Sequence, residues 1–262
     1  NVTDNQTAIV RMSSIAASAI LVGMGLEPVM QMVCRDRNRI AMQSDLLGAH
    51  ALGIRNCLCL SGDHQSAGAG GRLLGHPGAK NVYDIDSIQL LSVVKGLRDK
   101  AVQEGGDSID PAAPFFIGAA WTPLGPPEKF RTIRLAKKVE AGADFIQTQA
   151  VYDTARFAEA VKRAADQGLT EKTAILGGVI VPRSAGMLSY MHKNVPGVEV
   201  PDALIERMKS ASDPKAEGIA LAVELVQAIK EIPGIRGVHI QAIEAEALLP
   251  DIIKKAGLLP RP

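Results

Sequence analysis

Short apolar runs that close on polar residues recur along the chain, and they limit the folds that it can adopt. The clearest is Asn56–Asp63, in which Asn-Cys-Leu-Cys-Leu leads directly into Ser-Gly-Asp. A run that is apolar on both faces is typical of a buried parallel strand. Such runs end near residues 34, 62, 121, 151, 181 and 241. Their spacing is one or two multiples of about thirty residues, the length of a βα unit. The pattern therefore predicts a parallel α/β fold.

The number of strands separates two parallel architectures. A doubly wound sheet could use six or seven strands, whereas a (β/α)8 TIM barrel needs eight and about 250 residues. The chain has 262 residues. We favour the TIM barrel, as a single domain over residues 1–262 whose first strand would precede Asn1. The predicted strands are a stub at Val2 and whole strands over residues 28–34, 56–62, 115–121, 145–151, 174–181 and 237–243.

Helical periodicity fills the intervals between these strands. Asp36 is a candidate N-cap for the second helix, and Asp84 or Asp86 opens the third. Residues 65–80 are rich in glycine and lack a dinucleotide-binding fingerprint, so we expect a long functional or mobile loop there. The predicted helices cover residues 8–23, 38–52, 84 or 86 to about 103, 128–140, 153–168, 184–192, 201–211, a longer one from Pro214, and 246–257.

Composition excludes several functional classes. The formal net charge is +1 and aromatic residues make up 3%, which argues against nucleic acid and anionic membranes as partners. No apolar run is long enough to span a membrane. Cys34, Cys57 and Cys59 lie on predicted buried strands, which suggests a reducing, cytoplasmic compartment. We expect Cys57 and Cys59 to point to opposite faces of their strand. No Cys-x-x-Cys occurs, so no metal site is expected.

Polar residues mark the carboxyl ends of the predicted strands, which face one mouth in a barrel. The set has few titrating groups and suits a heterocycle with amide-like edges. Glutamine within an apolar strand costs free energy unless its amide is satisfied, so glutamines are site candidates, although each could instead bond to neighbouring backbone. The set comprises Thr3, Asp4, Gln31, Arg35, Asp36, Ser61, Gly62, Asp63, Trp121, Thr122, Gln147, Gln149, Arg183, Ser184 and Gln241.

Two further groups of residues have alternative interpretations. Arg131, Arg134, Lys137 and Lys138 share one predicted helix. They form either a solvated face or, in part, a partner for a ligand phosphate. His239, on the last predicted strand, lines either the core or the mouth.

Several segments, in order along nearly the whole chain, resemble the methylenetetrahydrofolate reductase family. The closing Gly-Val-His-Ile and the Val-Tyr-Asp-Ile-Asp segment look most like the forms in acetogenic bacteria, where the reductase works with a partner subunit. The segments that carry the resemblance are residues 1–5, 34–39, 60–63, 82–87, 137–144, 147–149 and 237–240.

The resemblance implies a barrel that binds FAD and transfers a hydride from flavin N5 to 5,10-methylenetetrahydrofolate, which gives 5-methyltetrahydrofolate. Asp63, Gln149 and Thr3 match folate-contacting positions, and Asp63 would tune hydride transfer electrostatically. The electron donor stays open between NADH, NADPH and an iron–sulfur partner subunit, with a hetero-oligomer as one arrangement. The flavin-contacting positions would be Thr3, Gln31, Ser61, Gly62, Asp63, Tyr83, Trp121, Arg134, Lys137 and Lys138.

The chain departs from the family pattern at several positions. The family's general acid is a glutamate on the first strand, which would lie before Asn1. Gln31 stands where many members have histidine, and Ser61 and Trp121 replace arginine and tyrosine. Ala245 replaces a folate-binding arginine of some members. Two alternatives follow: a barrel methyltransferase that binds methyltetrahydrofolate without flavin, or a non-catalytic folate- or flavin-binding subunit of a larger complex.

Overall fold

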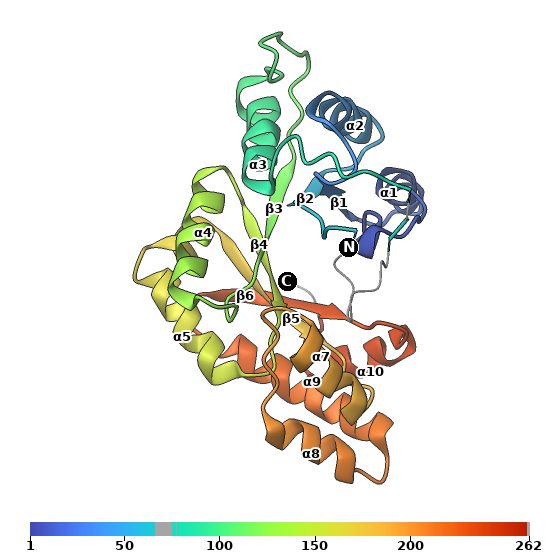
Figure 1. Cartoon of the computed structure of the whole chain (residues 1–262), viewed down its shortest axis with the longest axis vertical. Helices are drawn as coiled ribbons and strands as arrows, with labels where there is room; N and C mark the ends of the chain where they lie inside the picture. The colour runs from blue at the N-terminus through green and yellow to red at the C-terminus, as the bar shows by residue number, and fades with distance from the viewer. Residues whose placement is uncertain (66–74, 77, 261–262) are drawn as a thin grey trace. The chain divides into compact units, whose positions relative to one another are not determined.

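The computed structural model describes residues 1–65, 75, 76 and 78–260 (Figure 1). Within these residues, strands and helices alternate, and the strands form a six-stranded sheet in the order β1 to β6. Every predicted whole strand is present to within about two residues at each end. The sheet is open, because no pairing among the described residues joins β6 to β1. The strands are β1 (Val29–Val33), β2 (Asn56–Leu60), β3 (Phe116–Trp121), β4 (Phe145–Ala150), β5 (Ala174–Ile180) and β6 (Ile235–Gln241).

The chain divides into two compact units, which are described one at a time. The first contains residues 1–120 and 137–145, and the second contains residues 121–136 and 146–262. The prediction of a single domain over residues 1–262 stays a prediction.

In the first unit, β1 pairs in parallel with β2, and β2 with β3. The predicted stub is also present. Val2 forms a parallel bridge with Met30, and its N–H donates to the Val29 carbonyl at 2.9 Å. Its carbonyl accepts from Gln31 N–H at 3.0 Å. This part of the chain therefore adds a further strand position beside β1. Figure 1 shows it with helices α1 (Ser14–Gly23), α2 (Arg39–Ala51) and α3 (Ser87–Lys95).

Local capping explains where these helices begin. The Asp86 side chain accepts from Ile88 and Gln89 N–H in a capping box, so α3 begins at the second of its two predicted starts. The Asn38 side chain, and not Asp36, caps α2 by accepting from Ala41 N–H. The first helix begins at Ser14 instead of residue 8, because residues 6–8 form a tight turn with Thr7 in the left-handed region. The glycine-rich loop predicted over residues 65–80 lies mostly outside the described residues.

The expected orientation of the cysteines was wrong. All three thiols are buried and free. Cys57 and Cys59 share one face of β2, because side chains two apart along a strand point the same way, and their thiols hydrogen-bond to each other. The hydrogen bond with Cys57 and burial raise the pKa of Cys59 well above its usual value. The prediction that these cysteines are packed in the core is confirmed.

In the second unit, β5 and β6 pair in parallel, with Gly178 opposite His239 and Ile180 opposite Gln241. Helix α9 (Pro214–Lys230) covers one face of this pair. A Cβ on Gly177 would lie 2.5 Å from the Ile229 side chain, so glycine there permits the close approach of α9. Because side chains alternate, Gly178, His239 and Gln241 lie on the face away from α9.

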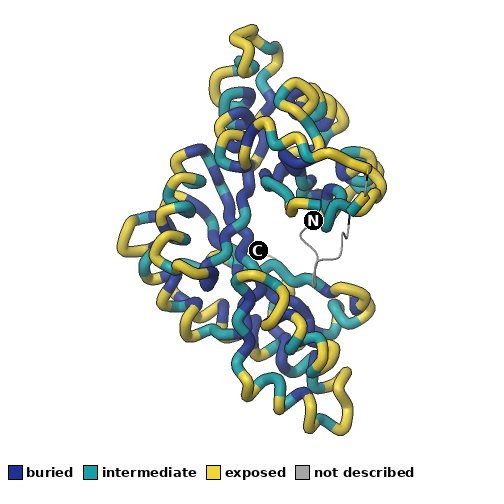
Figure 2. The backbone as a smooth tube through the Cα atoms, viewed as in Figure 1, coloured by how far each residue is buried: buried dark blue, intermediate teal, exposed yellow. Residues whose placement is uncertain are grey.

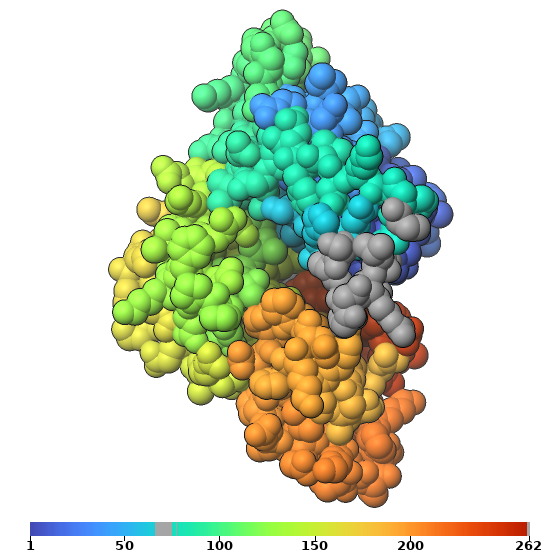
Figure 3. Space-filling model, viewed as in Figure 1, coloured from blue at the N-terminus to red at the C-terminus, as the bar shows by residue number. Residues whose placement is uncertain are grey.

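The other helices of the second unit follow the predicted order. In the space-filling view, α7 and α8 form one continuous orange surface (Figure 3). The last strand begins two residues earlier than residue 237 and ends at Gln241. No helix of the described residues is long and apolar enough to cross a membrane. The bounds are α4 (Glu128–Glu140, across both units), α5 (Thr154–Ala165), α6 (Leu169–Lys172), α7 (Ala185–Asn194), α8 (Asp202–Ser210) and α10 (Leu249–Lys255).

Candidate functional site

A buried arginine organises the strand ends of the first unit. Arg35 follows β1 and is 2% exposed. Its guanidinium donates to both carboxylate oxygens of Asp36 at 2.7 Å, to the Asn5 carbonyl at 2.8 Å and to the Asp63 carbonyl at 3.1 Å. It therefore ties the stub, the end of β1 and the end of β2 together. Burial acts to raise the pKa of Asp36, but the hydrogen bonds and charge of Arg35 outweigh it and hold that pKa below its usual value.

The next two arginines of the Cys34–Arg39 segment are also structural. Arg37 donates to buried Asp4 at 2.6 Å, and Asp4 in turn accepts from Val33 N–H. Arg39 pairs with Asp84 at 3.0 Å on the surface. Arg35, Arg37 and Arg39 each hold a different segment near the strand ends. The Cys34–Arg39 segment therefore builds a rim at the carboxyl ends of β1 and β2, on which ligand-binding residues could lie.

Asp63 lies on this rim with its carboxylate exposed. No side chain of the described residues hydrogen-bonds to or forms an ion pair with that carboxylate. Gly62 has a φ of +85°, and a Cβ there would lie 3.1 Å from both Val33 and Arg35, so the turn requires glycine. The Tyr83 hydroxyl donates to the Gly62 carbonyl at 3.1 Å. Burial raises the pKa of Tyr83, and the Asp63 charge acts in the same direction. Gly62, Asp63 and Tyr83 are thus brought together.

The other predicted residues of the first unit differ in what they contact. Thr3 and Gln31 are half-buried beside the stub. The Gln31 amide has no hydrogen-bond partner among the described residues, and Gln31 lies on the β1 face opposite Met30. The Ser61 hydroxyl accepts from Ser87 N–H at 3.2 Å, at the start of α3. Ser61 therefore supports a helix start, and its contact with flavin stays a prediction.

The four cations of α4 have unequal roles. Lys138 donates to the Ala120 carbonyl within the first unit, and Lys137 is exposed. In the second unit, Arg131 donates to the Gly125 and Pro126 carbonyls at 3.0 and 2.9 Å. Arg134 is half-exposed and has no hydrogen bond or ion pair within the described chain. Lys137 and Arg134 are therefore the more available of the cations for a ligand phosphate.

Trp121 and the two strand glutamines belong to the second unit. Trp121 is 3% exposed and donates its indole N–H to the Arg131 carbonyl at 3.1 Å. The Gln149 amide oxygen accepts from Ala150 N–H at 3.1 Å, which is the backbone alternative anticipated for these glutamines. Gln147 is buried, yet its amide has no hydrogen-bond partner in the described part of the chain. The ligand roles of Trp121 and Gln149 stay predictions.

His239 is a candidate that the strand pattern pointed to only weakly. Its imidazole lies on the β6 face away from α9, opposite Gly178, where a Cβ would meet the Thr148 and Gln149 carbonyls at 2.5 and 2.9 Å. Its Nδ1 atom is buried and has no hydrogen-bond partner among the described residues. Burial lowers the pKa of His239 to about 4, so the ring is neutral near pH 7. A histidine within an apolar strand was the one sequence signal available for it.

The half-buried imidazole makes stability depend on pH. The unfolded chain binds a proton near the ordinary pKa of 6.5, whereas the folded protein does so only near pH 4. Between these values the unfolded state holds more protons, so the free energy of unfolding should fall as pH drops from 6.5 to 4, by up to about 3 kcal/mol. Urea unfolding of the wild type and of His239→Asn at a series of pH values measures this. The variant should lose that part of the slope; an unchanged slope would disprove the assignment.

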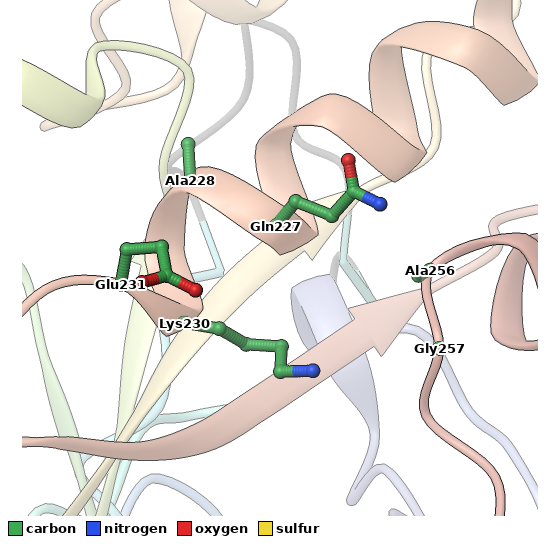
Figure 4. Close-up of a pocket in the computed structure, with 6 residues that line it drawn as sticks. All are labelled: Gln227, Ala228, Lys230, Glu231, Ala256 and Gly257. Carbon is green, nitrogen blue, oxygen red and sulfur yellow. The ribbon is translucent and has the colours of Figure 1, made fainter.

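Two surface hollows have different relations to these residues. One, in the first unit, is lined in part by Asn5, Arg35 and Asp36 and so adjoins the strand-end rim. The other lies where Gln227 and Lys230 extend from α9 toward Ala256 and Gly257 (Figure 4). None of the predicted site residues lines the second hollow. No group of three potential metal ligands occurs in the described part of the chain.

Comparison with known proteins identifies the family. The family model described as methylenetetrahydrofolate reductase matches residues 1–257. The chain belongs to this family. A Caenorhabditis elegans protein named "Probable methylenetetrahydrofolate reductase (NADPH)" is 24% identical over 262 residues, 97% of this chain and 36% of its own length. "Methylenetetrahydrofolate reductase 2" of Schizosaccharomyces pombe is 30% identical over 133 residues, 48% of this chain and 21% of its own. The chain thus spans about a third or less of these relatives.

A solved structure supports the predicted fold of this reductase-family chain. It is titled "Uncharacterized protein from Clostridium thermocellum binds two copies of 5-methyl-5,6,7,8-tetrahydrofolic acid". It superimposes with a TM-score of 0.58 at 13% identity, over 94% of this chain and 77% of its own. The family match confirms the resemblance to the family. The superposition confirms the barrel-type α/β class, with the sheet open over the described residues.

Proposed function

We propose that the protein reduces 5,10-methylenetetrahydrofolate to 5-methyltetrahydrofolate, with FAD as its bound cofactor. The observation that carries this proposal is the family match over residues 1–257. The exposed carboxylate of Asp63 on the strand-end rim is compatible with it. That a protein of similar fold binds 5-methyltetrahydrofolate is consistent with folate as the substrate class.

The residues of the first unit fit a flavin. Gln31 offers an amide without a partner among the described residues, and Asp63 and Tyr83 lie together on the rim. Gly62 keeps the backbone of the turn free of a side chain. We assign Thr3, Gln31, Gly62, Asp63 and Tyr83 to flavin contacts in this unit. When bound, FAD would supply the hydride that converts the methylene carbon to a methyl group. The remaining assigned contacts are Ser61, Trp121, Arg134, Lys137 and Lys138.

The chain's own residues would bind and polarise the folate. A pterin ring has an amide-like edge, which the Gln149 amide could bind bidentately after releasing its bond to Ala150 N–H. The Asp63 charge would favour the positive charge that develops when the five-membered ring of the substrate opens. Ring opening also needs a proton donor. We assign no residue of this sequence to that role.

The electron donor and partners are further parts of the proposal. NADH, NADPH and an iron–sulfur partner subunit are all compatible with it, and the acetogen-like segments favour a partner subunit in a hetero-oligomer. A cytoplasmic location follows from the reduced, buried thiols as an expectation. The C. elegans relative carries NADPH in its name, which describes that protein.

The proposal predicts a yellow protein with reductase activity. Purified protein should carry FAD and, with an artificial electron donor, convert methylenetetrahydrofolate to methyltetrahydrofolate. Absorption spectroscopy and product chromatography measure the two properties, with protein stripped of flavin as the control. A folded, colourless protein that binds methyltetrahydrofolate would instead support the methyltransferase or binding-subunit alternative. Folded protein without flavin or activity would refute the reductase assignment.

A further inference from the structure

Gln147 has a buried amide that the described part of the protein leaves unpaired. It lies in β4, a strand that is buried at every position except the half-buried Gln149 (Figure 2). Gln147 is 6% exposed, and its amide has no hydrogen-bond partner among the described residues. A buried amide without a partner costs free energy in the folded protein. Its presence in the strand therefore needs an explanation.

The other buried side-chain amides of the described residues are hydrogen-bonded. Gln43, on α2, is 7% exposed. Its amide donates to the Arg39 carbonyl at 3.1 Å and accepts from Glu104 N–H at 2.7 Å. Asn56, which is 8% exposed, donates to two acceptors, both at 3.1 Å. Where a buried amide supports the fold, it is thus paired, and Gln147 is different.

The Gln147 amide is also within reach of a ligand. Some unpartnered polar atoms of the described residues are sealed from solvent, such as those of Thr132 and His239. Neither amide atom of Gln147 is among them, so a ligand can contact the group without opening the core. A polar group that is buried, unpaired and still accessible is the kind that binding sites use to orient a ligand.

The neighbouring Gln149 indicates the class of ligand. Side chains two apart on a strand point to the same face, about 6.6 Å from each other along it, so β4 presents two amides on one face. Both residues belong to the second unit. The tetrahydropterin ring of folate carries polar atoms on both of its fused rings, with the 4-oxo, N3–H and 2-amino groups on one and N8–H on the other. One such ring can therefore meet both amides.

We propose that Gln147 is a second substrate-binding amide, which hydrogen-bonds to the tetrahydropterin ring beside Gln149. The inference rests on the proposed function, because the folate contact of Gln149 is part of it. The contact is with the ring and not with the glutamate tail of folate. In the complex the amide gains the partners that the described residues do not supply.

Titration calorimetry of the purified protein, with its FAD, against 5-methyltetrahydrofolate tests the proposal. Gln147→Met keeps the length of the side chain and removes its amide, so it should weaken binding roughly 10- to 100-fold, the effect of leaving ring atoms unpaired. 6-Methyltetrahydropterin, which has the ring without the tail, should lose affinity by the same factor, and FAD content should not change. Equal affinity in variant and wild type, a loss confined to the ligand with the tail, or loss of FAD would overturn the inference.

The melting temperature without folate separates a binding role from a structural one. Gln147→Met should leave it unchanged or raise it, because the change removes an unpaired buried group. A lower melting temperature, or failure to fold, would show that the amide supports the fold and would overturn the proposal. Gln43→Met is the matched control, since Gln43 is equally buried but hydrogen-bonded. It should lower the melting temperature by at least about 2 °C and leave the affinity for methyltetrahydrofolate unchanged.

The same measurements distinguish this inference from the proposed function. A wild type that binds no methyltetrahydrofolate would overturn both. A wild type that reduces methylenetetrahydrofolate, with unchanged folate affinity in Gln147→Met, would refute the role of Gln147 alone.

Discussion

Replacement of Asp63 by asparagine is expected to slow hydride transfer to methylenetetrahydrofolate by roughly 100-fold, the usual effect of removing one electrostatic contact to the reacting group. Asparagine preserves the shape of the side chain and removes its charge. The carboxylate is exposed and has no side-chain partner in the described residues, so the substitution should leave the fold intact. Arg35 holds Asp63 through its main-chain carbonyl, which the variant keeps.

Separate measurement of the two half-reactions makes this prediction specific. Reduced enzyme is mixed with methylenetetrahydrofolate in a stopped-flow instrument, and flavin reoxidation is followed by absorbance. Flavin content and reduction by an artificial donor should be nearly unchanged in Asp63→Asn. Asp166→Asn removes a carboxylate from an exposed surface pair with Lys162 and should react like the wild type. Equal reoxidation rates in Asp63→Asn and the wild type would show that Asp63 has no role in catalysis.

Replacement of Arg35 by methionine is expected to lower the free energy of unfolding by about 1–3 kcal/mol, the cost of leaving hydrogen-bond partners unsatisfied, because the Arg35 side chain is buried although Asp36 is exposed. Methionine retains much of the side-chain volume but none of the donors. The variant would leave Asp36 without its bidentate partner and the Asn5 and Asp63 carbonyls without theirs. Because the Arg35 guanidinium holds the Asp63 main-chain carbonyl, the rate of folate-dependent flavin reoxidation should fall as well.

Arg39→Met provides the matched control for this experiment. Arg39 lies four residues later in the same segment, and its side chain is 42% exposed, so its loss should change stability little. Urea unfolding at pH 7 compares the two. The folded-state pKa of Asp36 lies below its ordinary value of 3.8, so the stabilisation from its ionised form is complete above that value and is lost as pH falls through the folded-state pKa. Similar losses in both variants would refute a special role for Arg35.

The local parts of this fold were predictable because their signals are local. Runs such as Phe115–Trp121 and Ala174–Val181 predicted strands through their length and apolar character. Asp86 marked the start of α3 through a capping interaction that spans three residues. Only the first helix was placed too early, because a tight turn with left-handed Thr7 interrupts a periodic sequence. The assignment to the reductase family also rested on residues in their order along the chain.

The chemical surroundings of individual side chains were decided by tertiary structure. Ser61 was predicted to contact flavin, and its hydroxyl accepts a hydrogen bond at the start of α3, 26 residues away. Trp121, predicted at the mouth, is buried with its N–H bonded to Arg131. The sequence by itself determined the strand–helix order and the family. The tertiary structure alone decided that Arg35 joins segments 28 and 30 residues away, and that α1 turns its serines inward. The physical reason is that hydrogen-bond partners and burial depend on chain segments that pack together in space, and no periodicity along the chain records them.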